Sequence, residues 1–331
     1  MSDGGFEVYP PPPPPPLTPP PSITPSRSRR KLFLFLGGVF AIFIVFISLL
    51  ILLASSFGQG DNLDLNFGGD KVALVEVTGV IEEPRETVDL IRKYAKDTSI
   101  RAIVVRLNSP GGGVAASQEI YEEVKRVRDT SQKPVVASIS TVGASGAYYI
   151  ACGATKIVAN AGSLTGSIGV IANWTNYGDL YRWAKLKDVT FKSGAMKAAG
   201  SPVRDPSEEE KQYFQELINE MHEQFVESVA EGRKMPIEEV KRLADGRAYS
   251  GAHAKKLGLV DEIGNLQDAI TLASKLAGLK GEPKIVEPAK EKVTLFDILF
   301  GNLERFLPIH GKVEPVLEYR WTMKPLEQLE K

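Results

Sequence analysis

Short apolar runs alternate with amphipathic segments along most of the chain. Residues 88–94 and 120–127 carry apolar side chains at the spacing of one helix face. The alternation of strand and helix predicts an α/β domain with a largely parallel sheet. The runs that predict strands lie at 72–77, 101–107, 134–140, 156–159 and 189–192.

A long helix is predicted after Pro206. Ser207 and Glu210 have the spacing of a capping box, and apolar residues follow at helical spacing until about Gly232. We expect this helix to pack against a core or a subunit interface. Residues 281–331 form a C-terminal extension to which the pattern assigns no role.

The N-terminus has a different composition. Residues 1–31 are dominated by proline, which favours an extended, disordered tail, with a ligand for a proline-reading partner domain as the alternative. Residues 32–54 carry no charge and are long enough to cross a bilayer as a helix. A cleavable signal is the alternative, but its apolar region should be shorter.

Charge sets the expected orientation of this segment. Four basic residues at 27–31 precede it and acidic residues follow, which predicts a cytoplasmic N-terminus and a domain outside the cytoplasm. Residues 55–70 then form a tether, and residues 71–280 the domain itself. The predicted location is the bacterial inner membrane, with a single pass and contact with membrane lipid.

Composition excludes several classes of function. The formal net charge of −1 provides no basic surface for nucleic acid. The single cysteine, Cys152, cannot form an intramolecular disulfide, and neither it nor the three histidines has metal-ligand spacing. This composition disfavours both a disulfide scaffold and a zinc enzyme.

Two glycine-rich turns follow predicted strands. Gly111–Gly113 lies between a strand and a helix. The pattern by itself favours a structural turn, and the alternative is a site where exposed backbone N–H groups bind an oxyanion. The second turn, 143–147, places Ser145 before a short helix at 148–152. Ser145 there is either a helix cap or a nucleophile beside a helix N-terminus.

A serine nucleophile requires a general base. His222, His253 and His310 lie in contexts typical of surface or core histidines. Lysine remains, and the segment 191–197 carries Lys192 and Lys197 at a predicted strand end.

Taken together, these motifs resemble the signal peptide peptidase SppA family. They are the triple glycine, the Gly-Ala-Ser-Gly sequence at 143–146, the Leu-Thr-Gly-Ser-Ile-Gly-Val sequence at 164–170, and Lys-Ser-Gly-x-x-Lys at 192–197. The resemblance covers roughly 72–279 and is to the short, single-domain form with an N-terminal anchor.

The resemblance implies a Clp-protease or crotonase-like α/β fold and a Ser-Lys dyad. It places Ser145 as nucleophile, Lys197 as general base, Ser167 as the residue that orients the lysine, and the N–H groups of Gly112 and Gly146 in an oxyanion hole. It also implies a homo-oligomer near the membrane that cleaves remnant signal peptides and other hydrophobic polypeptides, without a metal or cofactor.

The choice of base stays open between two lysines, because Lys192 lies in the same motif. Spacing from Ser145 favours Lys197. An ordinary lysine, with a pKa of about 10.4, is a poor base at neutral pH. We expect burial among the small apolar residues 195–199 to lower that pKa.

Three hypotheses follow for the function. The first is a membrane-anchored serine endopeptidase acting on hydrophobic peptides. The second is a membrane-tethered scaffold of the same fold that binds peptides without cleaving them. An acyl-CoA enzyme of this broad fold is disfavoured because the domain is expected outside the cytoplasm, away from acyl-CoA.

Overall fold

The computed structural model describes residues 36–49, 71–288 and 316–320. The chain divides into two units, 1–67 and 68–331, which we describe separately. In the first unit, residues 36–49 form a helix. Among the described residues no helix is both long enough and apolar enough to span a membrane. The predicted span at 32–54 extends beyond the described helix at both ends, and the predicted tail and the whole tether lie outside the described residues.

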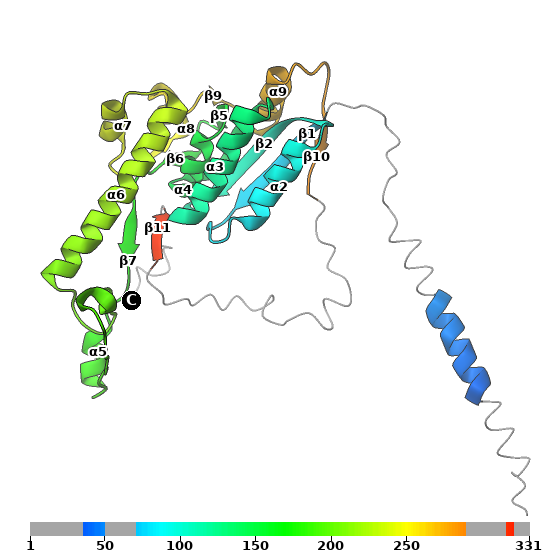
Figure 1. The fold of residues 1–331 in the computed structure, drawn as a ribbon. Coiled ribbons are helices and arrows are strands. Elements are labelled where there is room, and N and C mark those ends of the chain that lie inside the picture. The colour runs from blue at the N-terminus through cyan, green and yellow to red at the C-terminus, as the bar shows by residue number, and fades with distance from the viewer. Residues whose placement is uncertain (1–35, 50–70, 289–315, 321–331) are drawn as a thin grey trace, which may run out of the picture. The chain divides into compact units, whose positions relative to one another are not determined.

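The second unit is built on a mainly parallel sheet with the strand order β10-β1-β2-β4-β5-β9 (Figure 1). Short strands β6 and β8 extend it beside the end of β4. Four of the five predicted strands are confirmed, as β1, β2, β4 and β5. The bounds are β1 Lys71–Thr78, β2 Ile100–Ser109, β4 Val135–Ala144, β5 Lys156–Ala159, β6 Leu164–Gly166, β8 Ala248–Ser250, β9 Glu262–Ile263 and β10 Lys284–Val286.

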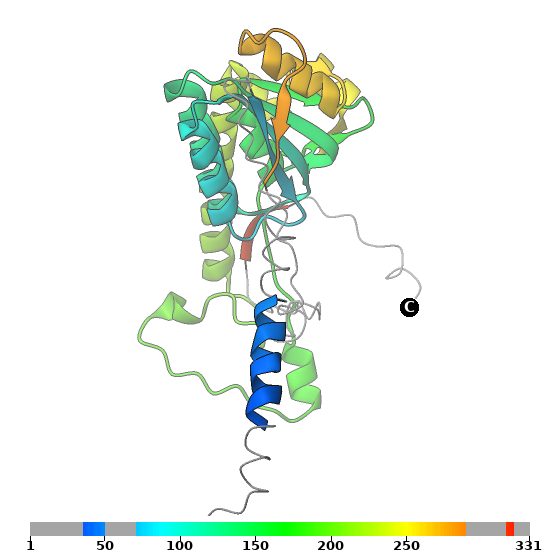
Figure 2. The same cartoon turned by 90° about the vertical axis from the view of Figure 1, so that its right-hand side faces the viewer.

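Helices connect these strands and cover the sheet. Helices α2 and α3 lie side by side on one face in Figure 1, and Figure 2 shows the sheet beside them. The helices are α2 Arg85–Lys96, α3 Val114–Thr130, α4 Gly146–Cys152, α5 Gly178–Trp183, α6 Glu208–Arg233, α7 Ile237–Leu243, α8 Gly251–Lys256 and α9 Leu266–Leu276.

The strands bury both of their faces. Val72, Leu74 and Val104 belong to a cluster with the apolar face of α9, whereas their neighbours Ala73 and Val75 belong to the larger cluster under α2, α3 and α4. Successive side chains of a strand point to opposite faces of the sheet, so continuous apolar runs are what a sheet covered on both sides requires.

The capping box of α6 is confirmed. The Ser207 side chain accepts from the Glu210 N–H, and the Glu210 carboxylate accepts from the Ser207 N–H. The C-terminal half of α6 is buried around Phe225 and Val229. The helix ends near Gly232, as predicted: its last residue is Arg233, and Lys234 is its C-cap. A Cβ at Gly232 would lie 2.2 Å from the Cys152 carbonyl oxygen, so glycine there permits close packing of α6 on α4.

The strand predicted at 189–192 is wrong. These residues form part of a loop after α5, and the side chain of Phe191 is 95% exposed. An apolar run forms a strand only where a neighbouring strand pairs with its backbone, and none is paired with this loop in the described part of the chain. Figures 1 and 2 both place α5 at the N-terminal end of α6, away from the sheet.

A second, small sheet contains β3 (Gly111–Gly113), β11 (Val316–Arg320) and β7 (Ile171–Asn173) in the order β3-β11-β7. Both pairings are antiparallel. Two strands, β10 and β11, thus come from the extension that the sequence pattern left without a role.

Candidate active site

Ser145 occupies a strained turn between β4 and α4. Its backbone has φ 55° and ψ −118°, a conformation that residues with a Cβ rarely adopt, and the residue is only 1% exposed. The surrounding structure holds it there, because the Ser145 N–H donates to the Gly166 carbonyl at 2.8 Å and its carbonyl accepts from the Tyr149 N–H at 2.8 Å. Such strain is typical of functional sites.

The helix-cap interpretation of Ser145 fails. Ser145 stands at the N-cap position of α4, but its side chain makes no capping hydrogen bond. A cap residue has extended backbone dihedrals that turn its oxygen toward the first helical N–H groups, and the positive φ of Ser145 differs from that arrangement. The strained conformation therefore favours the nucleophile.

The triple glycine is required by close backbone contact. A Cβ at Gly112 would lie 2.1 Å from the Ile81 carbonyl oxygen, and Gly111 has φ 100°. Ile81 pairs with the strand on that side, since its N–H donates to the Gly111 carbonyl and its carbonyl accepts from the Gly113 N–H. Because successive residues of a strand direct their backbone groups to opposite edges, the N–H of Gly112 faces the other way.

Gly112 and Gly146, the two predicted oxyanion-hole residues, lie next to each other. A Cβ at Gly146 would be 3.3 Å from the Gly112 backbone nitrogen. The same Cβ would be 2.3 Å from the Ser117 hydroxyl oxygen, so only glycine fits. The structure thus brings both glycines together beside Ser145.

Ser117 is a residue of this site that the sequence reasoning missed. It lies on α3, is fully buried, and its hydroxyl has no hydrogen-bond partner within the described structure. A buried hydroxyl without a partner is costly, which makes it unusual in a core. Its place in the sequence, on a helix four residues after Gly113, carried no signal beyond that of an ordinary small residue.

Ser167, the predicted lysine-orienting residue, lies close to Ser145. In the parallel pair of β4 and β6, Ala144 is opposite Gly166, the residue before Ser167. Ser167 has φ 50°, its N–H donates to the Arg247 carbonyl, and its hydroxyl donates to the Gly246 carbonyl at 3.1 Å. The hydroxyl is thus held in place by a backbone contact.

Lys197 is not placed as predicted within a single chain. It lies in a short 3-10 helix, Ala195–Ala198, and is exposed, so the expected burial among small apolar residues is wrong for the isolated chain. The reason is that its loop, together with α5, projects away from the sheet. No hydrogen bond in the described structure joins Lys197 to Ser145 or Ser167. Lys192 donates to the Ala195 carbonyl at 2.6 Å and thereby holds the loop that carries Lys197.

An ion pair anchors the Lys197 loop to α6. The Arg204 guanidinium donates to the Glu210 carboxylate at 2.7 Å and to the Ala198 carbonyl at 2.8 Å, one residue after Lys197. The hydrogen bond from Arg204, followed by that from the Ser207 N–H, lowers the pKa of Glu210 from its ordinary 4.5 to about 2. The Arg204 side chain thus connects Glu210, at the start of α6, to the loop that carries Lys197.

The lowered pKa of Glu210 predicts an acid-sensitive contact. Because the folded pKa lies below the unfolded one, the ionised carboxylate stabilises the fold above about pH 4.5, and this stabilisation is lost as the pH falls toward 2. In urea denaturation from pH 6 to pH 2, we expect the wild type to lose more stability than Glu210→Gln. Glu208→Gln, which removes an exposed partner of Lys211 on the same turn, is the control. An equal loss of unfolding free energy between pH 6 and pH 2 in the wild type and in Glu210→Gln would contradict the prediction.

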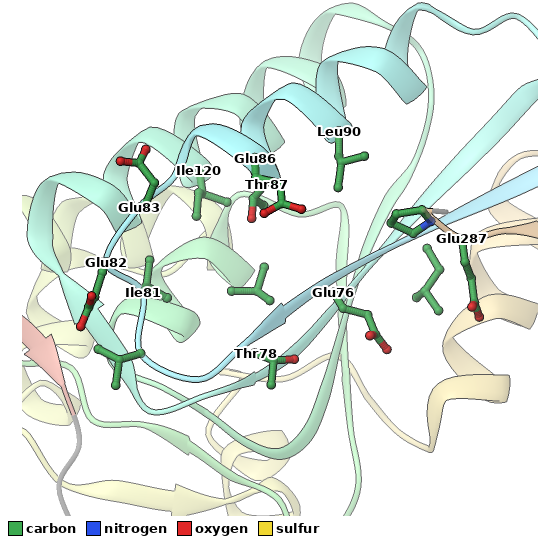
Figure 3. A pocket seen from close by; sticks show the side chains of 14 residues that line it. Glu76, Thr78, Ile81, Glu82, Glu83, Glu86, Thr87, Leu90, Ile120 and Glu287 are labelled. Carbon is green, nitrogen blue, oxygen red and sulfur yellow. The ribbon is translucent and has the colours of Figure 1, made fainter. Parts of the chain in front are cut away.

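A cavity of about 620 Å³ lies beside β1 and α2 (Figure 3). Apolar residues such as Leu90 and Ile120 line it together with five carboxylates. None of the predicted site residues lines it, although its wall includes Ile81, which pairs with β3. The carboxylates are Glu76, Glu82, Glu83, Glu86 and Glu287.

Two other candidate groups have structural roles. His222 is hydrogen-bonded through Nε2 to the Ala244 carbonyl at 2.9 Å. Cys152 is fully buried, and burial raises the pKa of its thiol to about 12, far from the range of a reactive thiolate. His310 lies outside the described residues.

Comparison with known proteins gives a consistent result. Residues 128–280 match peptidase family S49. The chain is 37% identical to a putative protease of Methanocaldococcus jannaschii, over 80% of this chain and 88% of that protein. It is 36% identical to a putative signal peptide peptidase SppA of Enterococcus faecium, over 69% and 68% of the respective chains. It is 42% identical to a putative protease of Synechocystis sp., over 66% and 77%.

The mixed α/β fold is consistent with that of S49 peptidases. The match covers the strained serine and the loop with both lysines, and the relatives that it resembles are aligned over most of their length. By these similarities the chain belongs to peptidase family S49, the signal peptide peptidase SppA family.

Proposed function

We propose that this protein is a membrane-anchored serine endopeptidase that cleaves remnant signal peptides and other hydrophobic polypeptides with a Ser-Lys dyad. The observation that carries the proposal is the strained, buried turn of Ser145 beside the backbone of Gly112 and Gly146. The scaffold hypothesis leaves the strain at Ser145 unexplained, because peptide binding alone does not require it.

The proposed reaction begins with attack by the Ser145 hydroxyl on a substrate peptide carbonyl. The neutral amine of Lys197 takes the hydroxyl proton and later gives it to the leaving amine. The N–H groups of Gly112 and Gly146 stabilise the negative charge on the carbonyl oxygen. Water, activated by the same lysine, then hydrolyses the acyl-enzyme.

The exposure of Lys197 supports a site completed by a second subunit. The proposed dyad requires contact between Lys197 and Ser145, and the single chain buries the serine while it leaves the lysine on a projecting loop. The same region carries an exposed apolar surface that includes Trp183, which is 81% exposed, and Phe191. Exposed apolar surfaces of this kind are typical of interaction sites. A homo-oligomer would cover this surface and desolvate the lysine.

Membrane attachment is the second part of the proposal. The uncharged segment at 32–54 and the basic residues before it support a single-pass anchor with the N-terminus in the cytoplasm and the domain outside, as in a bacterial inner membrane. A domain of Clp-protease or crotonase-like architecture would then meet peptides released at the membrane surface.

The test is digestion of a set of synthetic signal peptides by the detergent-solubilised chain, with products identified by mass spectrometry. We expect cuts within the apolar stretch of each peptide and none in a charged peptide of equal length. Covalent labelling by a serine-reactive probe should be confined to Ser145. Binding of the signal peptides with neither cleavage nor labelling would favour the scaffold hypothesis instead.

A further inference from the structure

The hydroxyl of Ser117 on α3 is turned away from its own helix. A serine or threonine inside a helix commonly donates to the carbonyl four residues earlier. Thr130, Thr271 and Ser274 do so, and Ser274 donates to the Ile270 carbonyl at 2.9 Å. The Ser117 hydroxyl makes no such bond and has no hydrogen-bond partner in the described structure, although the residue is fully buried. Its oxygen is directed at another element instead.

That element is α4, which begins at the residue after the proposed nucleophile. A Cβ at Gly146 would lie 2.3 Å from the Ser117 hydroxyl oxygen and 3.2 Å from the Ser117 Cβ. Gly146 therefore packs directly against this hydroxyl. An oxygen atom can approach a Cα–H group closely, in the manner of a weak hydrogen bond. Serine at position 117 thus makes a contact with Gly146 that alanine would lose.

A second glycine brings the other end of α4 against α3, and the two helices lie side by side (Figure 1). Gly153 is the C-cap of α4, and a Cβ there would lie 2.9 Å from the Tyr121 carbonyl oxygen. Ser117 and Tyr121 are four residues apart and therefore lie on the same side of α3. Helix α4 is thus held against α3 at both ends, and Ser117 makes the contact at the end that carries the site.

The place of Gly146 matters because its N–H is one of the two donors of the proposed oxyanion hole. Its Cβ position lies 3.3 Å from the nitrogen of Gly112, which provides the other donor. An oxyanion hole works only where both donors lie about 2.7–3.1 Å from the position at which the negative charge develops. A side chain that fixes Gly146 relative to Gly112 therefore fixes the geometry of the hole.

We infer that Ser117 is a positioning residue of the proposed oxyanion hole: its hydroxyl holds Gly146 where the Gly146 and Gly112 N–H groups can donate to one oxygen. The inference rests on the proposed function and assigns Ser117 no contact with substrate. A buried hydroxyl without a hydrogen-bond partner destabilises the fold. The geometry of the site and the stability of the fold are therefore in opposition at Ser117, as is common at functional sites.

Ser117→Ala in the full-length, detergent-solubilised chain is expected to separate catalysis from stability. Loss of the oxygen leaves a void beside Gly146 into which the backbone relaxes. We expect kcat for a fluorogenic signal peptide to fall about tenfold or more, because the donor is displaced. KM should stay within about twofold of wild type, since the hole acts on the transition state and not on bound substrate. Removal of the unpaired hydroxyl should raise the melting temperature by about 2–4 °C.

Ser274→Ala is the matched control. It also removes the hydroxyl of a buried helical serine, but that hydroxyl is hydrogen-bonded, and α9 packs on the opposite face of the sheet from α3. We expect Ser274→Ala to keep the kcat and KM of the wild type and to lower the melting temperature, because a hydrogen bond is lost. The two substitutions should thus have opposite effects on stability, and only Ser117→Ala should lower kcat.

A double-mutant cycle tests the contact itself without catalysis. Gly146→Ala places a Cβ against the Ser117 oxygen, so we expect it to lower the melting temperature of an otherwise wild-type chain. In a Ser117→Ala chain the 2.3 Å clash is absent, and the remaining approaches to the Cβ of residue 117 and to the Gly112 nitrogen are 3.2 and 3.3 Å. The same substitution should there lower the melting temperature by about half as much or less.

An unchanged kcat in Ser117→Ala would overturn the inference and leave the peptidase standing. A fall in kcat together with a lower melting temperature would also overturn it, because a merely structural role predicts that both are lost. Additive effects of Ser117→Ala and Gly146→Ala on the melting temperature would show that the two residues make no contact that matters. A wild-type chain that cleaves no peptide would instead reject the proposed function, and the positioning role with it, whatever the cycle shows.

Discussion

Replacement of Ser145 by alanine is expected to lower kcat/KM for peptide cleavage by about 10³-fold or more, because the nucleophile is lost while the oxyanion hole remains. The fold should be retained, since the Ser145 hydroxyl caps no helix. The measurement is cleavage of a fluorogenic signal peptide. Substantial remaining activity in Ser145→Ala would reject Ser145 as the nucleophile.

Ser145→Gly provides a second readout from the same residue. Glycine adopts the observed φ of 55° without the steric cost that a Cβ imposes, and such strain costs about 1–3 kcal/mol. The extra freedom of glycine in the unfolded chain offsets part of the gain. We therefore expect Ser145→Gly to be inactive but more stable than Ser145→Ala by about 1 kcal/mol in urea denaturation. Equal stability of the two variants would mean that the turn stores no strain.

Mixing two inactive variants is expected to restore activity. If Lys197 of one subunit serves Ser145 of its neighbour, an equal mixture of Ser145→Ala and Lys197→Ala chains contains subunit boundaries with both groups intact. After full exchange these are roughly a quarter of all boundaries, so about a quarter of wild-type activity should return. A dyad within one chain cannot be rebuilt in this way.

The controls separate assembly from chemistry. A mixture of Ser145→Ala with Ser145→Gly lacks the serine at every boundary and should stay inactive. Lys192→Ala alone should keep most of its activity, because Lys192 is not the proposed base, although it contributes one hydrogen bond to the loop at the Ala195 carbonyl. Absence of recovery, despite exchange demonstrated by fluorescence transfer between labelled chains, would place the dyad within one chain. An inactive Lys192→Ala with an active Lys197→Ala would reverse the assignment of the base.

Local sequence determined most of the scaffold. Strand β5 has the bounds that its apolar run predicts, and α6 begins at the predicted capping box. These features depend on interactions within a few residues, or on a side-chain period that matches a sheet buried on both faces. The motif set likewise located the serine, the two glycines and Ser167, and the structure brings these residues together.

Other features depended on contacts between residues far apart in the chain. Ser145 precedes Gly146 in the chain, and Ser117 reaches Gly146 from α3. Only tertiary packing fixes the unusual backbone of Ser145 and the burial of the Ser117 hydroxyl. The run at 189–192 has the composition of a strand but pairs with no strand in the described residues. Lys197 on the following loop is exposed because nothing in the described part of the chain covers it.

Strand β11 is the clearest case of this second kind. Residues 316–320 pair with segments near positions 112 and 172, and no pattern within five residues can specify so distant a partner. The sequence by itself thus determined which segments form helices and core strands and which family they belong to. The tertiary structure decided which strands pair, and that the serine is buried while the lysine is exposed in one chain, because pairing and burial depend on the whole fold.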